Sequence, residues 1–330
     1  MKRSRHRMLR PSAVLVILTF VSVLALTPSS HGASPTTRTI KIVVGVPPGG
    51  AADSVARLLV EQISRTQAVS MVVENRPGAV NIIAMETVAR AAPDGNTLLL
   101  ITPAFVLSSQ LRRLSYDPFA NFESICFLVR TPMVIVVNGA SPYGTLADLM
   151  KAARAKPGEL TLAAAGPGTP AQIAFEMLKR AANVNMTFVP YPGGPPAITA
   201  LLGEHVTSAI SDYPGAAEQL KAGKLRALAT ASRTHFEALP DVPTAAEAGY
   251  EDIEEDLWFG LAAPAKTPKE TLFQLADWFT AALHAPEATA KLAIQGLYPS
   301  GMCGAEFSAF LRQRYDQFGR IIRESNFKAE

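Results

Sequence analysis

The chain has 330 residues, of which 48% are hydrophobic, and this is enough to bury a substantial core in two domains or lobes. Its formal net charge of +3 depends on the first ten residues, which hold five basic side chains and no acidic one. Without residues 1–33, 26 basic and 28 acidic residues remain, a net charge of −2. No basic patch is left to bind nucleic acid, so nucleic acid is not an expected partner.

Residues 1–33 have the pattern of a secretory signal peptide. The basic start is followed by an almost purely apolar run at 13–26, which is shorter than the roughly 20 residues that a membrane-spanning helix needs. Small residues at Ser30 and Gly32 fit a cleavage site near residue 33. We therefore expect an exported protein, with an uncleaved membrane anchor as the alternative.

The chain contains only two cysteines, Cys126 and Cys303. Export would permit a disulfide between them, but Cys126 lies in an apolar segment, which favours a buried thiol that packs as a small hydrophobic group. Beyond residue 33, the histidines His205, His235 and His284 are far from one another and from both cysteines. The sequence therefore predicts no metal site and no cofactor.

Beyond the leader, short apolar runs alternate with amphipathic stretches, which predicts an α/β protein with mainly parallel sheets. Strands are expected at 40–44, 71–74, 97–101, 160–164, 186–189, 206–210 and 225–229, and the runs 132–137 and 258–263 are expected to cross between lobes. Capping boxes at 244–247 and 267–270 predict two helix starts, and aromatic residues at helical spacing predict a last helix near 307–322.

Three expected helices follow their strands through loops rich in glycine and proline, at 45–51, 166–170 and 190–196. The first N–H groups of a helix have no intrahelical partner, and the helix dipole adds partial positive charge, so each loop is a candidate anion site. No lysine follows the first loop, which argues against a nucleotide P-loop. If the first loop belongs to one lobe and the other two to the second, they face each other across a cleft.

A series of short motifs runs in a fixed order from about residue 40 to the end of the chain. The motifs are PPGGAAD at 47–53, VENRPGA at 73–79, APDG at 92–95, YDP at 116–118, VPY at 189–191, AGKLRALA at 222–229, LPDVPT at 239–244, EAG at 247–249 and WFGLAAP at 258–264. With these motifs the chain resembles the extracytoplasmic receptors of tripartite tricarboxylate transporters, the Bug family of periplasmic solute-binding proteins.

The resemblance implies a two-lobed α/β fold of the type II periplasmic-binding-protein class, a Venus flytrap in which each lobe is a sheet flanked by helices. Residues 34–136 and 257–330 would form the first lobe, and residues 137–256 the second. The implied function is that of a monomeric periplasmic receptor, which captures a small carboxylate-bearing metabolite in the interlobe cleft for membrane transporter subunits. The identity of that carboxylate stays open.

Two other functions stay open as alternatives. The protein could be a ligand sensor that reports to a membrane signalling partner, because such a sensor would bind the same ligands. It could also be an exported enzyme, but the sequence has no G-x-S-x-G nucleophile elbow and no histidine and carboxylate at a motif-like spacing, so no enzyme is expected.

The resemblance also implies which residues contact the ligand. In the family, the first strand-to-helix loop and the glycine-rich loop of the other lobe hold one carboxylate, largely through main-chain groups and ordered water. Asp53 has three possible roles, namely to cap a helix, to order a bridging water or to face an ammonium group. The expected contacts are Pro48, Gly49, Gly50, Ala51, Ala52, Asp53, Gly166, Gly168, Thr169 and Gln172, with Thr102, Ser108, Tyr191, Asp212 and Tyr213 as further wall residues.

The chain departs from the family pattern at three positions. Gly78-Ala79-Val80-Asn81 stands where the family usually has a longer Gly-Ala-Gly-Gly-Asn loop. Pro192 follows Tyr191 where a lysine is common, which removes a possible cation for a second carboxylate, and Ser108 stands where asparagine is common. The expected anchor for one carboxylate is intact, and the changes fall at the end of the site that would determine specificity.

Overall fold

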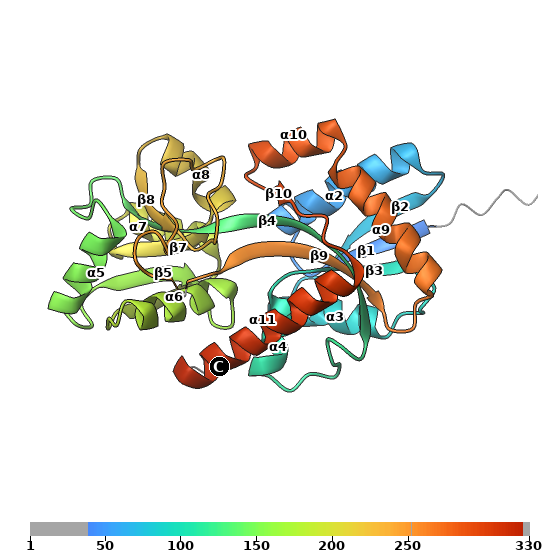
Figure 1. The fold of residues 1–330 in the computed structure, drawn as a ribbon, viewed down its shortest axis with the longest axis horizontal. Coiled ribbons are helices and arrows are strands. Elements are labelled where there is room, and N and C mark those ends of the chain that lie inside the picture. Colours follow the sequence, from blue (N-terminus) through green and yellow to red (C-terminus); the bar gives the residue numbers. More distant parts are fainter. Residues whose placement is uncertain (1–38, 252, 326–330) are drawn as a thin grey trace, which may run out of the picture. The chain divides into compact units, whose positions relative to one another are not determined.

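The computed structural model describes residues 39–251 and 253–325 (Figure 1). The predicted signal peptide, residues 1–33, lies outside the described residues. Across the two described ranges, no helix combines the length and the apolar character that a membrane span requires.

In the described part of the chain, ten strands form one mixed sheet, in the order β2-β1-β3-β9-β4-β7-β5-β6, with β8 and β10 also paired to β4. The outer triplets β2-β1-β3 and β6-β5-β7 are parallel, as the sequence predicts. The central strands β4 and β9 are antiparallel to their neighbours, which the sequence does not predict. The strands are β1 (Thr39–Val44), β2 (Ser70–Asn75), β3 (Thr97–Ile101), β4 (Phe122–Asn138), β5 (Thr161–Ala165), β6 (Thr187–Tyr191), β7 (Ser208–Asp212), β8 (Leu225–Thr230), β9 (Asp256–Pro264) and β10 (Tyr298–Pro299).

Strand β4 belongs to both lobes of the fold. Its residues 122–132 pair with β9, and its residues 133–138 pair with β7 and β8. Figure 1 shows β4 and β9 side by side where the chain passes between the lobes. The first lobe therefore contains β1, β2, β3, β9 and β10, and the second contains β5 to β8. The predicted residue boundaries of the lobes stay a prediction.

Helices cover both faces of the sheet. The side chains at 133–137 of β4 alternate between them, because Met133, Ile135 and Val137 enter one core while Val134 and Val136 enter another. The first of these cores continues across both lobes and contacts α11, which also packs on α4 and α6. The helices are α2 (Ala51–Thr66), α3 (Ile82–Ala89), α4 (Ala104–Leu111), α5 (Leu146–Ala155), α6 (Pro170–Ala181), α7 (Gly194–Leu202), α8 (Tyr213–Lys221), α9 (Lys269–Leu283), α10 (Pro286–Ile294) and α11 (Gly304–Ser325), with a 3-10 turn at Ala79–Asn81.

The capping pattern at 244–247 is wrong as a helix start, whereas the pattern at 267–270 is confirmed as one, because α9 begins at Lys269. Thr244 and Glu247 do exchange reciprocal hydrogen bonds, but they close a turn that ends at Gly249, which has a φ of +92°. At α9 only the side-chain cap is missing, because the hydroxyl of Thr267 donates to the carbonyl oxygen of Pro264. Local sequence specifies the polar exchange, but whether a helix follows depends on what the next residues pack against.

Cys126 and Cys303 form a disulfide, contrary to the preference for a buried thiol at Cys126. Cys126 is buried in β4, and Cys303 immediately precedes α11, 177 residues further along the chain. The bond therefore joins the start of the last helix to the strand that both lobes share. A cross-link over a loop of this length removes much conformational freedom from the unfolded chain.

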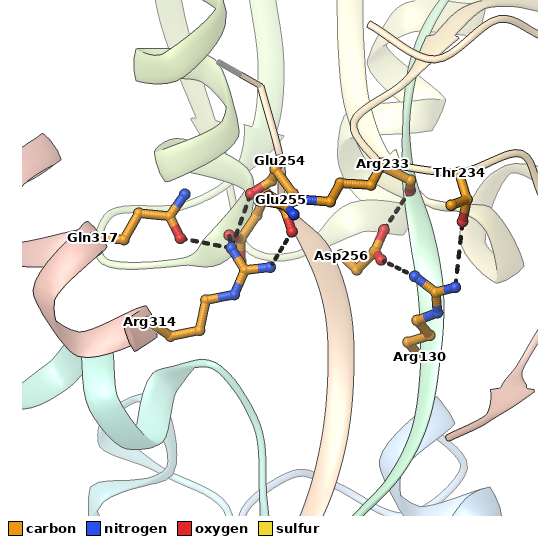
Figure 2. A network of polar contacts seen from close by, with 9 residues as sticks. Arg130, Arg233, Thr234, Glu254, Glu255, Asp256, Arg314 and Gln317 are labelled. Carbon is orange, nitrogen blue, oxygen red and sulfur yellow. Dashed lines mark hydrogen bonds and ion pairs between the residues drawn. The ribbon is translucent and has the colours of Figure 1, made fainter. Parts of the chain in front are cut away.

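A network of polar contacts surrounds the point where the chain returns from the second lobe into β9 (Figure 2). Nη2 of Arg314, in α11, donates to Oε1 of Glu254 at 3.1 Å, and its Nη1 donates to the Glu254 carbonyl oxygen at 3.2 Å. Nη1 of Arg130, in β4, donates to Oδ2 of Asp256 at 3.3 Å. Two arginines from different elements therefore hold the returning segment.

Glu255 lies between these two paired acids and is fully buried. Neither of its carboxyl oxygens has a hydrogen-bond partner among the described residues, and Nη1 of Arg314 is 4.0 Å from its Oε2. Burial raises the pKa of Glu255 to about 8, because desolvation outweighs the attraction of Arg314 and the neighbouring acids add repulsion. The carboxyl group is therefore mostly protonated at neutral pH.

Replacing Glu255 with glutamine should remove a pH dependence of stability. The unfolded carboxyl loses its proton near pH 4.5, whereas the folded one keeps it to about pH 8. Its contribution to stability is therefore fully present below about pH 4.5 and is lost as the pH rises to about 8, by about 1.4 kcal/mol per pH unit. In urea denaturation, we expect the free energy of unfolding of Glu255→Gln to rise steadily relative to that of the wild type as the pH increases over this range.

The matched control is Glu251→Gln, which neutralises an exposed acid four residues earlier. It should leave the pH profile of the unfolding free energy unchanged. Equal profiles for Glu255→Gln and the wild type would contradict the assignment of Glu255 as a buried, protonated acid.

Candidate functional site

The loops that the sequence singles out lie at two edges of the sheet. Strands β1, β2 and β3 are parallel, so their carboxyl ends at Val44, Asn75 and Ile101 share one edge. Strands β5, β6 and β7 end together in the second lobe, at Ala165, Tyr191 and Asp212. Each edge carries a glycine-rich loop that leads into a helix, at 45–50 before α2 and at 166–169 before α6.

The first loop is held by Asp53, which is buried in the first turn of α2. Its Oδ2 accepts hydrogen bonds from the Gly49 N–H and from Nε of Arg57, each at 2.9 Å, and its Oδ1 accepts from Nδ2 of Asn75 at 2.9 Å. The hydrogen bond from Arg57 is the main cause that lowers the pKa of Asp53 to about 2, against the opposing effect of burial. Asp53 is therefore ionised, and its charge is balanced by Arg57, one turn further along the same helix.

The same loop presents unpaired main-chain donors. Helix α2 begins at Ala51 after Gly50, and no side chain caps it. Within the described residues, its first N–H groups therefore lack an intrahelical partner, and the helix dipole makes this end attractive to an anion. Pro48 precedes the turn, and Ala52 is buried behind it.

The second loop has a parallel construction. The Gly168 N–H donates to Oε1 of Gln172, a buried residue in the first turn of α6, at 2.9 Å. The hydroxyl of Thr169 donates back to the carbonyl oxygens of Ala165 and Gly166, so it does not cap the helix. Gly168 has a φ of +75° and Gly49 one of +88°, a conformation that favours glycine in both loops.

The loop at 78–81 is held in an uncommon conformation. Gly78, Ala79, Val80 and Asn81 all have positive φ, including +52° at the β-branched Val80. Such a value costs conformational energy and is maintained only by surrounding contacts. Here Nδ2 of Asn81 donates to Oγ1 of Thr102 at 3.0 Å, which ties the loop to the residue that follows β3.

The other predicted wall residues have different surroundings. Ser108 is buried in α4 and not at a strand end. Tyr191 ends β6 beside Ala165. Asp212 is the last residue of β7, two residues beyond the predicted strand, and its Oδ1 accepts from the Gly215 N–H at the start of α8. Burial raises the pKa of Asp212. Contact of these residues with a ligand stays a prediction.

Tyr213 is buried against the first lobe. A Cβ atom added to Gly296, which follows α10, would lie 2.2 Å from its ring. The ring of Tyr213 therefore contributes to packing between the lobes.

The third glycine-rich loop, at 190–196, offers few donors, because Pro195 and Pro196 occupy the first turn of α7 and have no N–H.

One pocket at the first loop is lined by residues of both lobes. It has a volume of about 240 Å³ and is lined by Gly49, Ala51 and Ser54 from the first loop and α2, by Pro214 and Ala217 from α8, and by Ile294 and Gln295 at the end of α10. The wall facing the first loop therefore comes from α8, next to Asp212. A larger groove, of about 950 Å³, lies away from these loops between α9 and the start of α11.

Three residues that position the loops are absent from the predicted site, namely Arg57, Asn75 and Asn81. The spacing of Asp53 and Arg57, four residues apart on a helix, is a signal for an ion pair that could have been recognised. The roles of Asn75 and Asn81 depend on which strands are neighbours, and the sequence alone does not provide that. Within 39–251 and 253–325, no cluster of His, Cys, Asp and Glu could hold a metal ion.

Comparison with known proteins places this geometry in context. A family model described as tripartite tricarboxylate transporter family receptor matches residues 55–327. The chain is 31% identical to the periplasmic binding protein BugD. The match covers 89% of this chain and 99% of BugD, with a TM-score of 0.77. An R. palustris protein solved with adipate is 30% identical, with coverages of 89% and 98% and a TM-score of 0.79.

MatC from Rhodopseudomonas palustris, solved with bound malate, is 27% identical to the chain. The match covers 87% of this chain and 99% of MatC, with a TM-score of 0.75. The three solved structures confirm the two-lobed α/β fold that the sequence predicts.

Replacing Gly45 with alanine should disturb the first edge of the sheet. A Cβ atom at Gly45 would lie 2.7 Å from Cβ of Asn81, so Asn81 and its hydrogen bond to Thr102 must shift. We expect Gly45→Ala to lower the free energy of unfolding by about 1–3 kcal/mol, measured by urea denaturation without ligand.

Gly50→Ala is the matched control, because its added Cβ would meet nothing closer than 3.8 Å and Gly50 has an ordinary φ of −76°. It should lower the free energy of unfolding by less than Gly45→Ala does, by about 0.5–1 kcal/mol for alanine at the N-cap of α2. Equal stability of the two variants would show that Gly45 does not support the loop at 78–81.

Proposed function

Because the chain belongs to the tripartite tricarboxylate transporter family receptors, to which the Bug proteins also belong, we propose that it is an extracytoplasmic receptor for a small carboxylate. The observation that carries the proposal is the pair of glycine-rich loops at the carboxyl ends of β1 and β5, in a family of solute receptors. Relatives solved with adipate and with malate support a carboxylate ligand. The family consists of receptors, which supports binding without catalysis.

In the proposed mechanism, one carboxylate of the ligand accepts hydrogen bonds from free main-chain N–H groups at the start of α2 and in the loop at 166–169. Anions are favoured at such helix ends. A ligand that contacts both lobes binds the closed state better than the open state and therefore shifts the population toward closure. The closed protein then presents a surface to membrane transporter subunits.

The proposed location is the periplasm, after cleavage of the leader at about residue 33. The likeness to the periplasmic protein BugD supports this location, and the disulfide between Cys126 and Cys303 suits an oxidising compartment. The proposed receptor acts as a monomer and needs no cofactor.

A melting experiment tests the proposal. The mature protein is unfolded and refolded to remove any carried ligand, and its melting temperature is recorded with mono-, di- and tricarboxylates, amino acids and aromatic acids. A ligand at about a hundred times its dissociation constant should stabilise the folded state by roughly 2.7 kcal/mol. We expect a clear shift with one class of carboxylate, and no shift with any acid would contradict the proposal.

A variant locates the binding to the loops. Gly166→Leu should lower the affinity for the best acid at least about tenfold, because its side chain fills the space in front of the second loop while its Cβ is 3.4 Å from the Tyr191 carbonyl oxygen, an ordinary contact. Gly144→Leu makes the same change at an exposed position of the second lobe and should bind normally. Normal binding by both variants would place the ligand elsewhere.

A further inference from the structure

The two glycine-rich loops share one hydrogen bond that the proposed function does not explain. In each loop, a glycine with positive φ donates its N–H to the side chain four residues later, in the first turn of the following helix. Gly49 donates to Asp53 and Gly168 donates to Gln172, both at 2.9 Å. The two loops belong to different lobes and differ in sequence, so the shared bond points to a shared task.

The shared bond uses one main-chain donor in each loop and ties that loop to the first turn of the helix that follows. With the Gly49 N–H turned toward Asp53, the donors at the start of α2 are left for a ligand. Asn75 strengthens this arrangement, because its Nδ2 donates to the Val46 carbonyl oxygen at 3.0 Å as well as to Asp53. Preorganised donors bind an anion more tightly, because they need not be reoriented when the ligand arrives.

The two hydrogen bonds differ in the charge of the group that accepts them. In the first lobe the acceptor is a carboxylate, and Arg57 forms an ion pair with it at 2.9 Å. In the second lobe the acceptor is a neutral amide. Both loops are therefore fixed without leaving a free negative charge beside the place where a carboxylate would bind. The side chain of Asp53 is only 4% exposed, so little of it can reach a ligand.

We propose that Asp53 and Gln172 are matched positioning residues, which fix the free donors of the two loops, and that Asp53 therefore does not select ligands that carry an ammonium group. The inference rests on the proposed function. It predicts that the site recognises a carboxylate and gains nothing from an ammonium group, so that an acid binds at least as tightly as its α-amino counterpart. Arg57 and Asn75 keep Asp53 in place.

Calorimetry with succinate, adipate and malate tests the positioning role. We expect Asp53→Ala and Gln172→Ala, each stripped by refolding and shown to be folded, to bind the best of these acids about tenfold more weakly than the wild type. Gln62→Ala is the control, because it removes a buried glutamine from α2 far beyond the first turn that holds Asp53, and the affinity of this variant should stay within about twofold of the wild type.

A pH profile separates positioning from a general loss of structure. Gln172→Glu keeps an oxygen acceptor for the Gly168 N–H but adds a negative charge next to the ligand. We expect it to bind more weakly than the wild type near neutral pH, and we expect the ratio of the two dissociation constants to fall as the pH is lowered and the new carboxyl group becomes protonated. A ratio that does not change with pH would overturn the charge argument.

Succinate and L-aspartate, which differ by one ammonium group, test the selectivity. The wild type should bind succinate at least as tightly as aspartate. A preference for aspartate of tenfold or more that is lost in Asp53→Asn would overturn the inference, because Asp53 would then contact the ligand. If no acid of the panel binds the wild type, the proposed function fails as well, whereas equal binding by the wild type and both alanine variants overturns only the inference.

Discussion

Strand β4 is the constraint on which the two lobes depend. Its first part pairs with β9, and its last part pairs with β7 and β8, so one continuous strand belongs to the sheet in both lobes. The disulfide at Cys126 attaches the start of α11 to this strand, and Arg130 extends from it to Asp256. The glycine-rich loops lie at the ends of the parallel strands on either side. Their separation and direction therefore follow from β4 and from the segments that hold it.

The chemistry at the loops is a matter of main-chain donors and balanced charge. Asp53 is ionised and paired with Arg57, and Gln172 takes the equivalent place without a charge. Both side chains accept from a glycine N–H, and no side chain caps the helix that follows in either loop. An anion would then interact with helix ends and not with a buried cation, which fits the absence of a lysine or arginine from 45–51 and 166–170.

Local pattern predicts the outer parallel strands and the glycine-rich loops well, because β-branched runs and glycine-proline breaks report on their own residues. It fails at β4, whose segment 122–131 has no regular alternation and is stabilised by pairing with β9, over 120 residues away. It fails at Thr244, where a capping pattern closes a turn. The disulfide and the hydrogen bond from Asn75 to Asp53 join residues distant in sequence, so their existence depends on the strand order.

The most direct test of this account is a crystal structure of the stripped protein with the acid that stabilises it most. The account predicts one ligand carboxylate within hydrogen-bond distance of main-chain N–H groups from both 50–53 and 166–171, with the Gly49 and Gly168 N–H groups still bound to Asp53 and Gln172. An acid that contacts only one lobe, or that lies in the groove between α9 and α11, would contradict it.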